Sequence, residues 1–156
     1  MKYITFVGRS DWSVVNSFWA TLFHTDIIHD EIQVIYKKHD KDMDESSIEG
    51  IKKILEVKDI DAEIEEYVIE DEFDVMKAAE HVEEICEDGA PVILDITPAR
   101  KAMASGSVIE GVKMEVEGVL YLYIDSVKNA DRPYLDIPLP RQDLVEMIGG
   151  DHLVES

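Results

Sequence analysis

The feature of this sequence that most constrains its fold is the alternation of short apolar segments with longer amphipathic ones. Short runs rich in β-branched and aromatic residues predict buried strands, whereas apolar residues at helical spacing predict helices that bury one face. Residues 3–8 (YITFVG) illustrate the first pattern, and residues 12–23 (WSVVNSFWATLF) illustrate the second. Strands that alternate with helices imply right-handed crossovers and a mainly parallel sheet that is covered on both faces.

The complete series predicts an α/β, Rossmann-like fold, with a doubly wound, mainly parallel sheet of about six strands and helices on both faces. The length of 156 residues indicates a single domain over residues 1–156, with a core over about 1–140 and a C-terminal extension over about 141–156. The expected strands are residues 3–8, 31–36, 62–69, 91–96, 118–124 and 132–139, and the expected helices are residues 12–23, 46–56, 71–89 and 97–111.

Two of the expected helices carry start signals. Ser46 and Glu49 have capping-box spacing in the second helix, and the fourth has Thr97 as its N-cap and Pro98 at its first position. Residues 39–46 (HDKDMDES) lack the central glycine and the final glutamate of a calcium-binding loop. A solvated loop is therefore expected before the second helix.

The charge of the chain limits the partners that it can bind. Acidic residues outnumber basic ones 35 to 15, which gives a formal net charge of −20 at pH 7. This charge argues against duplex DNA, whose binding requires many neutralised phosphates, but a small anion needs only a few local cations. Cys86 is the one cysteine, which excludes an intramolecular disulfide and a multi-cysteine zinc site. With no basic leader and no membrane-spanning apolar run, we expect a soluble cytoplasmic protein.

Two unusual polar loops follow the first and fourth expected strands. They are GRSDWS (8–13) and DITPARK (95–101). In the common doubly wound order, the first and fourth strands are neighbours, and ligands bind in the crevice outside their carboxyl ends. We therefore expect these two loops to meet at one crevice.

Arg100 and Lys101 stand where the fourth helix is expected to begin. Cations are disfavoured there, because the helix macrodipole places partial positive charge at the N-terminus. Free backbone N–H groups after Thr97 form an anion site, and a bound phosphate would offset the cost through charge-assisted hydrogen bonds. In the first loop, Arg9 similarly stands beside Ser10 at a helix start. We infer a phosphate-binding site, with solvated cations and an ordinary helix cap as the alternatives.

The serine-bearing first loop and the segment DITPARKA (95–102) resemble the CRISPR-associated Rossmann-fold (CARF) family, in particular its standalone ring-nuclease members. The order of elements is similar over nearly the whole chain, although only the two loops are specific. Ser10 matches the serine that the family's first loop commonly supplies, and Lys101 matches the lysine that commonly ends its second loop. Thr97 and Arg100 fall in that second loop.

The resemblance implies a homodimer that binds a cyclic oligoadenylate, most often cyclic tetra-adenylate, across its twofold axis. It also implies a ring nuclease that ends an antiviral signal without metal or cofactor. Each ribose 2′-OH of a cyclic RNA can attack its own 3′-phosphodiester, leaving a 2′,3′-cyclic phosphate, so the protein supplies geometry and charge stabilisation. Our hypothesis is that Lys101 neutralises the phosphorane and Ser10 orients the attacking hydroxyl or a phosphate oxygen. Arg9 and Arg100 would grip neighbouring phosphates.

Two other functions stay open at this point. One is a CARF sensor domain that binds without cleaving, and the other is an unrelated doubly wound enzyme or binder for a nucleotide or sugar phosphate. The G-x-G-x-x-G fingerprint is absent after the first strand, which disfavours NAD or FAD. Ala99 stands where many CARF members have glycine, and Trp12 is a candidate for stacking on an adenine, with packing as the alternative. The candidate catalytic residues are Lys101 and Ser10, the candidate ligand-binding residues are Gly8, Arg9, Ser10, Asp11, Trp12, Thr97, Pro98, Ala99, Arg100 and Lys101, and no metal ligand is expected.

Overall fold

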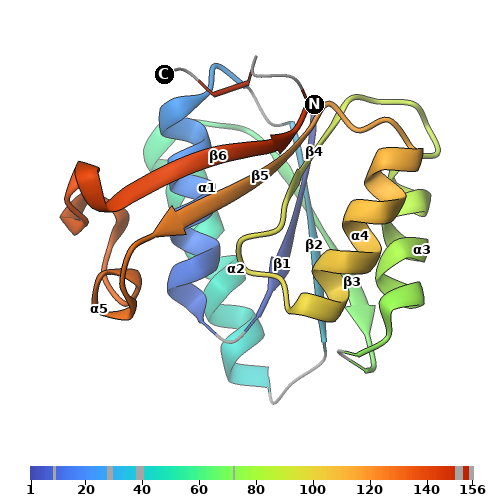
Figure 1. The fold of residues 1–156 in the computed structure, drawn as a ribbon, viewed down its shortest axis with the longest axis horizontal. Coiled ribbons are helices and arrows are strands. Elements are labelled where there is room, and N and C mark those ends of the chain that lie inside the picture. The colour runs from blue at the N-terminus through green and yellow to red at the C-terminus, as the bar shows by residue number, and fades with distance from the viewer. Residues whose placement is uncertain (9, 28–29, 38–40, 72, 150–152, 155–156) are drawn as a thin grey trace.

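The computed structural model describes residues 1–8, 10–27, 30–37, 41–71, 73–149 and 153–154 (Figure 1). The strands are β1 (Lys2–Val7), β2 (Glu31–Lys37), β3 (Glu63–Ile69), β4 (Val92–Asp95), β5 (Gly118–Ile124) and β6 (Gln142–Ile148). They form a six-stranded sheet in the order β3-β2-β1-β4-β5-β6. Neighbouring strands from β3 to β5 are parallel, and β6 is antiparallel to β5. This order confirms the Rossmann-like, doubly wound α/β fold.

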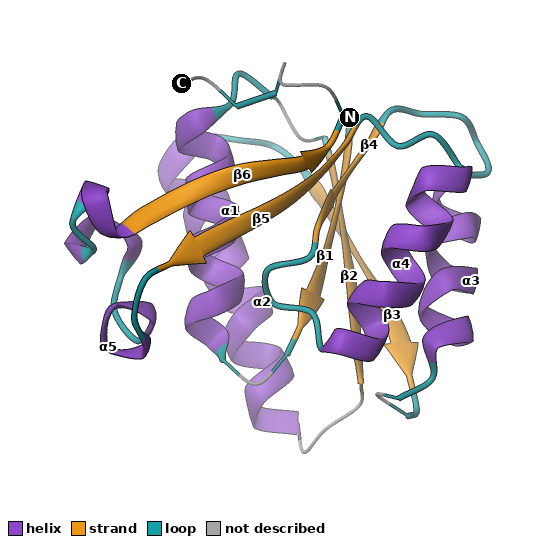
Figure 2. Cartoon of the chain, viewed as in Figure 1, coloured by secondary structure: helices purple, strands orange, loops and turns teal. Residues whose placement is uncertain are grey.

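The helices form two layers. They are α1 (Asp11–His24), α2 (Lys41–Lys58), α3 (Val75–Cys86), α4 (Lys101–Lys113) and the short α5 (Val127–Ala130). Figure 2 shows α1 and α2 on one face of the sheet and α3 and α4 on the other. Alternate residues of β1 serve the two layers, because Tyr3 packs in one apolar cluster with Phe18 of α1, and Ile4 packs in the other with Val82 of α3. Within the described part of the chain, no helix combines the length and the low polarity needed to cross a bilayer.

The second helix begins earlier than the sequence predicts. α2 starts at Lys41, so Ser46 lies inside the helix and the expected loop 39–46 is partly helical. No proline or glycine interrupts residues 41–49, and the Ser46 hydroxyl donates to Asp11 Oδ2 (2.6 Å) rather than capping α2. The capping-box prediction is therefore wrong.

The sixth strand lies later in the chain than predicted. Residues 132–139 contain a 3₁₀ turn, η1 (Tyr134–Asp136), and the start of a second, η2 (Leu139–Arg141), and β6 follows them. Pro133 and Pro138 have no N–H to donate to a strand ladder, which explains why this segment does not pair. The sheet instead continues into the segment that was expected to be a C-terminal extension.

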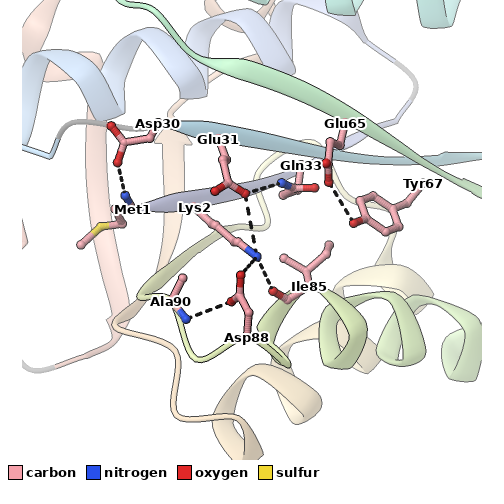
Figure 3. Close-up of polar contacts among 10 residues, drawn as sticks. All are labelled: Met1, Lys2, Asp30, Glu31, Gln33, Glu65, Tyr67, Ile85, Asp88 and Ala90. Carbon is pink, nitrogen blue, oxygen red and sulfur yellow. Dashed lines mark hydrogen bonds and ion pairs between the residues drawn. The ribbon is translucent and has the colours of Figure 1, made fainter.

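A polar cluster around Lys2 closes the amino edge of the sheet (Figure 3). The Lys2 ammonium donates to the Ile85 carbonyl oxygen (3.0 Å) and to Asp88 Oδ2 (2.8 Å), and Glu31 Oε2 lies 3.8 Å away. These contacts tie β1 to β2 and to the end of α3. Lys2 is buried with its charge paired, so its role at this edge is structural.

Candidate functional site

The loops that follow β1 and β4 meet, as the sequence predicts. β1 and β4 are parallel neighbours, with Tyr3 opposite Ile93 and Ile4 opposite Leu94. At the carboxyl edge the two loops are in backbone contact, because a Cβ atom added to Gly8 would lie only 2.0 Å from the Pro98 carbonyl oxygen. Gly8 therefore sets how closely the two loops approach.

α4 begins at Lys101, which is later than the sequence predicts. Arg100 is the N-cap residue, its side chain does not cap the helix, and its carbonyl oxygen accepts the first helical bond from Ala104 N (2.8 Å). The N–H groups of Lys101, Ala102 and Met103 precede that bond and have no acceptor within the helix. These three amides and the two cations thus coincide at one helix start, although the expected cap at Thr97 is wrong.

Thr97 anchors the loop before α4 instead of capping the helix. Its hydroxyl oxygen accepts from Leu122 N on β5 (2.8 Å), and its own N–H donates to Asp95 Oδ1 (2.9 Å). The neighbouring Ile96 N–H donates to the Leu120 carbonyl oxygen (3.0 Å). These bonds hold the first half of the loop against β5 and leave residues 98–100 to project toward α4.

Asp95 is a buried carboxylate that joins this loop to β1 and α1. Its Oδ2 accepts from the hydroxyls of Tyr3 (2.7 Å) and Ser17 (2.6 Å), with the Thr5 hydroxyl at 3.4 Å. Burial raises the pKa of Asp95, although the hydrogen bonds from Ser17, Thr97 and Tyr3 act in the opposite direction. Burial and the adjacent Asp95 charge hold the pKa of Tyr3 well above its usual range. Asp95 thus anchors the loop before α4 to β1 and α1, out of contact with solvent.

The start of α1 presents a second hydroxyl-bearing turn. Ser10 is the N-cap residue, but its side chain makes no capping hydrogen bond. The Ser10 carbonyl oxygen accepts two hydrogen bonds from Ser13, one from the backbone N–H (3.2 Å) and one from the side-chain hydroxyl (2.7 Å). Arg9, the predicted phosphate-gripping residue of this loop, lies outside the described residues.

A cavity of about 560 Å³ opens beside the two helix starts. Its walls carry two cations, two serines and an aromatic ring, and Lys101 is exposed to solvent beside it. The lining residues are Ser10, Ser13, Phe73, Pro98, Ala99, Arg100, Lys101 and Ala102. The structure therefore brings together five of the predicted site residues. Sequence reasoning missed Ser13, Phe73 and Ala102. Phe73 was missed because an exposed aromatic in a loop gives no periodic signal.

Four of the predicted site residues that the structure describes do not line this cavity: Gly8, Asp11, Trp12 and Thr97. The Asp11 carboxylate accepts hydrogen bonds from the hydroxyls of Ser46 and Ser47 on α2. Trp12 lines a separate groove of about 300 Å³, together with Trp19 of α1 and Tyr134. Asp11 thus joins α1 to α2, and Trp12 contributes to that second groove.

No protein-family model and no curated protein matches this sequence. Among solved structures, the chain is similar to Can2 from Sulfobacillus thermosulfidooxidans in complex with cyclic tetra-adenylate (TM-score 0.55, 16% identity, 77% of this chain and 31% of that one). It is also similar to Enterococcus italicus Csm6 bound to cyclic hexa-2′-fluoro-hexa-dAMP (TM-score 0.51, 14% identity, 94% of this chain and 41% of that one).

These likenesses concern the fold. At such low identity they show that the chain shares a Rossmann-like α/β fold with part of each of these proteins, in agreement with the order of its strands. The chain spans 31% of the Can2 chain and 41% of the Csm6 chain, so both proteins are considerably longer than the part that it resembles.

Proposed function

We propose that this chain binds a cyclic oligoadenylate, with cyclic tetra-adenylate as the first candidate, in the cavity beside the starts of α1 and α4. The observation that carries the proposal is the convergence of Arg100, Lys101 and Ala102 at the start of α4 with Ser10 on one cavity. A phosphodiester supplies the negative charge that such a helix start stabilises. The similarity in fold to two proteins bound to cyclic oligoadenylates supports this ligand class.

The net charge of the chain makes this local arrangement informative. A chain with a formal charge of −20 repels anionic ligands over most of its surface. The helix macrodipole disfavours a cation at a helix start by about 0.3–1 kcal/mol, and a bound phosphate would offset that cost through charge-assisted hydrogen bonds. An uncharged ligand would give no such compensation, which is why we favour a phosphate ester.

Replacing Lys101 with alanine tests the proposal. We expect a roughly 10- to 100-fold weaker affinity for cyclic tetra-adenylate, because a hydrogen bond to a charged group contributes about 1.5–3 kcal/mol. Lys113→Ala is the matched control, since it removes the same charge from the far end of the same helix, where Lys113 pairs with Glu110. Isothermal titration calorimetry on the three proteins gives the comparison.

Two results would oppose the proposal. Equal affinities of the Lys101 and Lys113 variants would remove Lys101 from the site. Binding of NAD or ATP, but not of cyclic tetra- or hexa-adenylate, would instead support the unrelated nucleotide-binding function.

The chain is proposed to work as a homodimer. A cyclic oligoadenylate carries more phosphates than the cations of one cavity can pair, and a second copy related by a twofold axis would double them. A stripe along α4 starts at Lys101 beside the cavity and continues through exposed Ser105, Ile109 and Val112. The side chains of Ile109 and Val112 are 58% and 52% exposed. The apolar end of this stripe, Ile109 and Val112, is the surface on which we place the second copy.

The outer strands extend this surface. Val119 packs in the core cluster beneath α3 and α4, so Tyr121 and Tyr123, which alternate with buried Leu120 and Leu122, lie on the same side of the sheet as α4. Both tyrosines are exposed, and Val145 of β6 pairs opposite Tyr121. Figure 1 shows α4, β5 and β6 toward the viewer. The proposed dimer face is Ile109, Val112, Tyr121, Tyr123 and Val145.

Ile109→Lys tests the dimer face. Burying an unpaired ammonium is unfavourable, and twofold symmetry introduces two of them, so we expect the dimer dissociation constant to rise by about 100-fold or more. Val57→Lys is the control, because Val57 is 73% exposed on α2, in the opposite layer. Sedimentation velocity at micromolar concentration measures the result, and a dimer that survives the Ile109 change would place the interface elsewhere.

The proposal also includes cleavage of the bound cyclic oligoadenylate. Lys101 would stabilise charge on the phosphorane, and Ser10 would orient the attacking 2′-OH or a phosphate oxygen. Linear products ending in 2′,3′-cyclic phosphate, formed in a single-turnover incubation with labelled cyclic tetra-adenylate, would support a ring nuclease. The lining residues that the structure describes carry no carboxylate or imidazole to act as a general base, which favours slow turnover or the second candidate, a sensor that binds without cleaving. Intact ligand after prolonged incubation would establish the sensor.

A further inference from the structure

Phe73 is an exposed aromatic side chain at the wall of the candidate cavity. It lies in the segment between β3 and α3, so it comes from a third loop that the sequence did not connect with the site. The side chain is 74% exposed, and it lines the same space as Arg100 and Lys101. The ring therefore leaves an aromatic face accessible to a ligand that occupies the cavity.

The backbone that carries Phe73 is firmly held. The Phe73 N–H donates to Asp71 Oδ1 (3.0 Å), and its carbonyl oxygen accepts from Val75 N (3.0 Å). The next residue, Asp74, caps α3 by accepting from Lys77 N (2.9 Å). The backbone of Phe73 is therefore tied to Asp71 and to the start of α3, which positions the residue at the cavity wall.

The position of this turn is set by α4 itself. A Cβ atom on Gly106 would lie 2.2 Å from the Val75 carbonyl oxygen, so the first residue of α3 packs directly on the α4 backbone. Gly106 follows Lys101 on the same helix by less than two turns. This contact thus holds the start of α3, two residues after Phe73, against the helix that carries Lys101.

We propose that Phe73 stacks on an adenine base of the bound ligand, while the start of α4 holds the adjacent phosphate. This inference rests on the proposed function and adds the base-recognition element. A nucleotide offers a flat aromatic face and an anion a short distance apart, and the cavity offers an aromatic ring and two cations. Stacking is worth about 1–3 kcal/mol per base, so loss of the ring is expected to weaken binding about 5- to 150-fold.

The test compares Phe73→Ala, Phe73→Leu and Phe73→Trp in titrations with cyclic tetra-adenylate. Leucine keeps apolar bulk without a π-face, so the alanine and leucine variants should both bind weakly, and the tryptophan variant should bind at least as tightly as the unmodified chain. Met76→Ala is the control, because Met76 is 69% exposed in the first turn of α3. Sedimentation velocity on the Phe73→Ala variant shows whether it dimerises as the unmodified chain does, so that weaker binding is not caused by loss of the dimer.

A phosphate-only probe separates base stacking from anion binding. Phe73→Ala should bind inorganic tripolyphosphate as the unmodified chain does, whereas Lys101→Ala should bind both probes weakly. If the unmodified chain binds cyclic tetra-adenylate and Phe73→Ala binds it equally well, the stacking inference is wrong and the proposed function stands. If the unmodified chain does not bind a cyclic oligoadenylate, the proposed function itself fails.

Discussion

Asp95→Asn is expected to lower the free energy of unfolding by about 3 kcal/mol, since each unsatisfied buried donor costs about 1–3 kcal/mol. Oδ2 accepts from the hydroxyls of Tyr3 and Ser17, and an amide nitrogen of the same size would face them with donors of its own. Because Asp95 is fully buried, water cannot replace the lost acceptor. The expected result is thus one of the largest available from a single isosteric change.

The same substitution is expected to weaken binding of cyclic tetra-adenylate, although Asp95 does not line the cavity. Asp95 Oδ1 holds the Thr97 N–H, and Thr97 in turn holds β5, so a shift at Asp95 moves the residues that precede α4. Urea unfolding measures the loss of stability, and calorimetry at a temperature where the variant is folded measures binding.

The control for Asp95→Asn must reproduce the change in net charge. Asp61→Asn does so at an exposed position before β3, and it should leave both measurements nearly unchanged. An Asp95→Asn variant as stable as the Asp61→Asn variant would mean that the buried hydrogen bonds contribute little, and that another contact positions the loop before α4.

The sheet and its layers could be predicted because they depend on periodicity. Apolar runs such as residues 3–8 and 91–96 are buried strands, and their adjacency follows from the common doubly wound order. The convergence of the two polar loops followed from the same argument, and the structure places both at one cavity.

The local bonding of the second loop could not be predicted in the same way. Thr97 and Pro98 have the residue types of a helix start, but the partner of the Thr97 hydroxyl is the N–H of Leu122, which is distant in the sequence. A tertiary hydrogen bond therefore replaced the expected cap. Asp95 did leave a signal, since a carboxylate that ends an apolar strand needs buried donors, but nothing local identified Tyr3 and Ser17 as those donors.

Phe73 could not be predicted as a site residue for a different reason. Residues 71–89 were interpreted as one helical segment, whereas α3 begins at Val75 and Asp74 caps it. Phe73 precedes that cap, so its side chain lies on a loop beside the cavity rather than on a helix. The late start of α3 is therefore what leaves Phe73 in the lining of the cavity.

Gly8→Ala is expected to disturb the contact between the two loops more directly than any change to a lining side chain. The new Cβ atom would lie 2.0 Å from the Pro98 carbonyl oxygen and 3.2 Å from its carbonyl carbon. Both are backbone atoms, so no side chain can rotate to make room, and β1 or the loop before α4 must shift. Overpacking of this kind costs about 1–3 kcal/mol, and a shift at Pro98 moves Arg100 and Lys101 with it.

Gly111→Ala is the informative comparison for Gly8→Ala, because Gly111 of α4 is also buried and its added Cβ atom would meet side chains of Leu94 and Val116 at 3.3 Å. Those side chains can adjust, and alanine favours a helix, so this variant should unfold near the same urea concentration as the unmodified chain. Gly8→Ala should unfold earlier and bind cyclic tetra-adenylate at least about tenfold more weakly, as expected when charged hydrogen bonds lose their geometry. If Gly8→Ala were as stable as Gly111→Ala but bound no ligand, the close approach would serve the site alone; if it bound normally, the position of Pro98 would not control the cations.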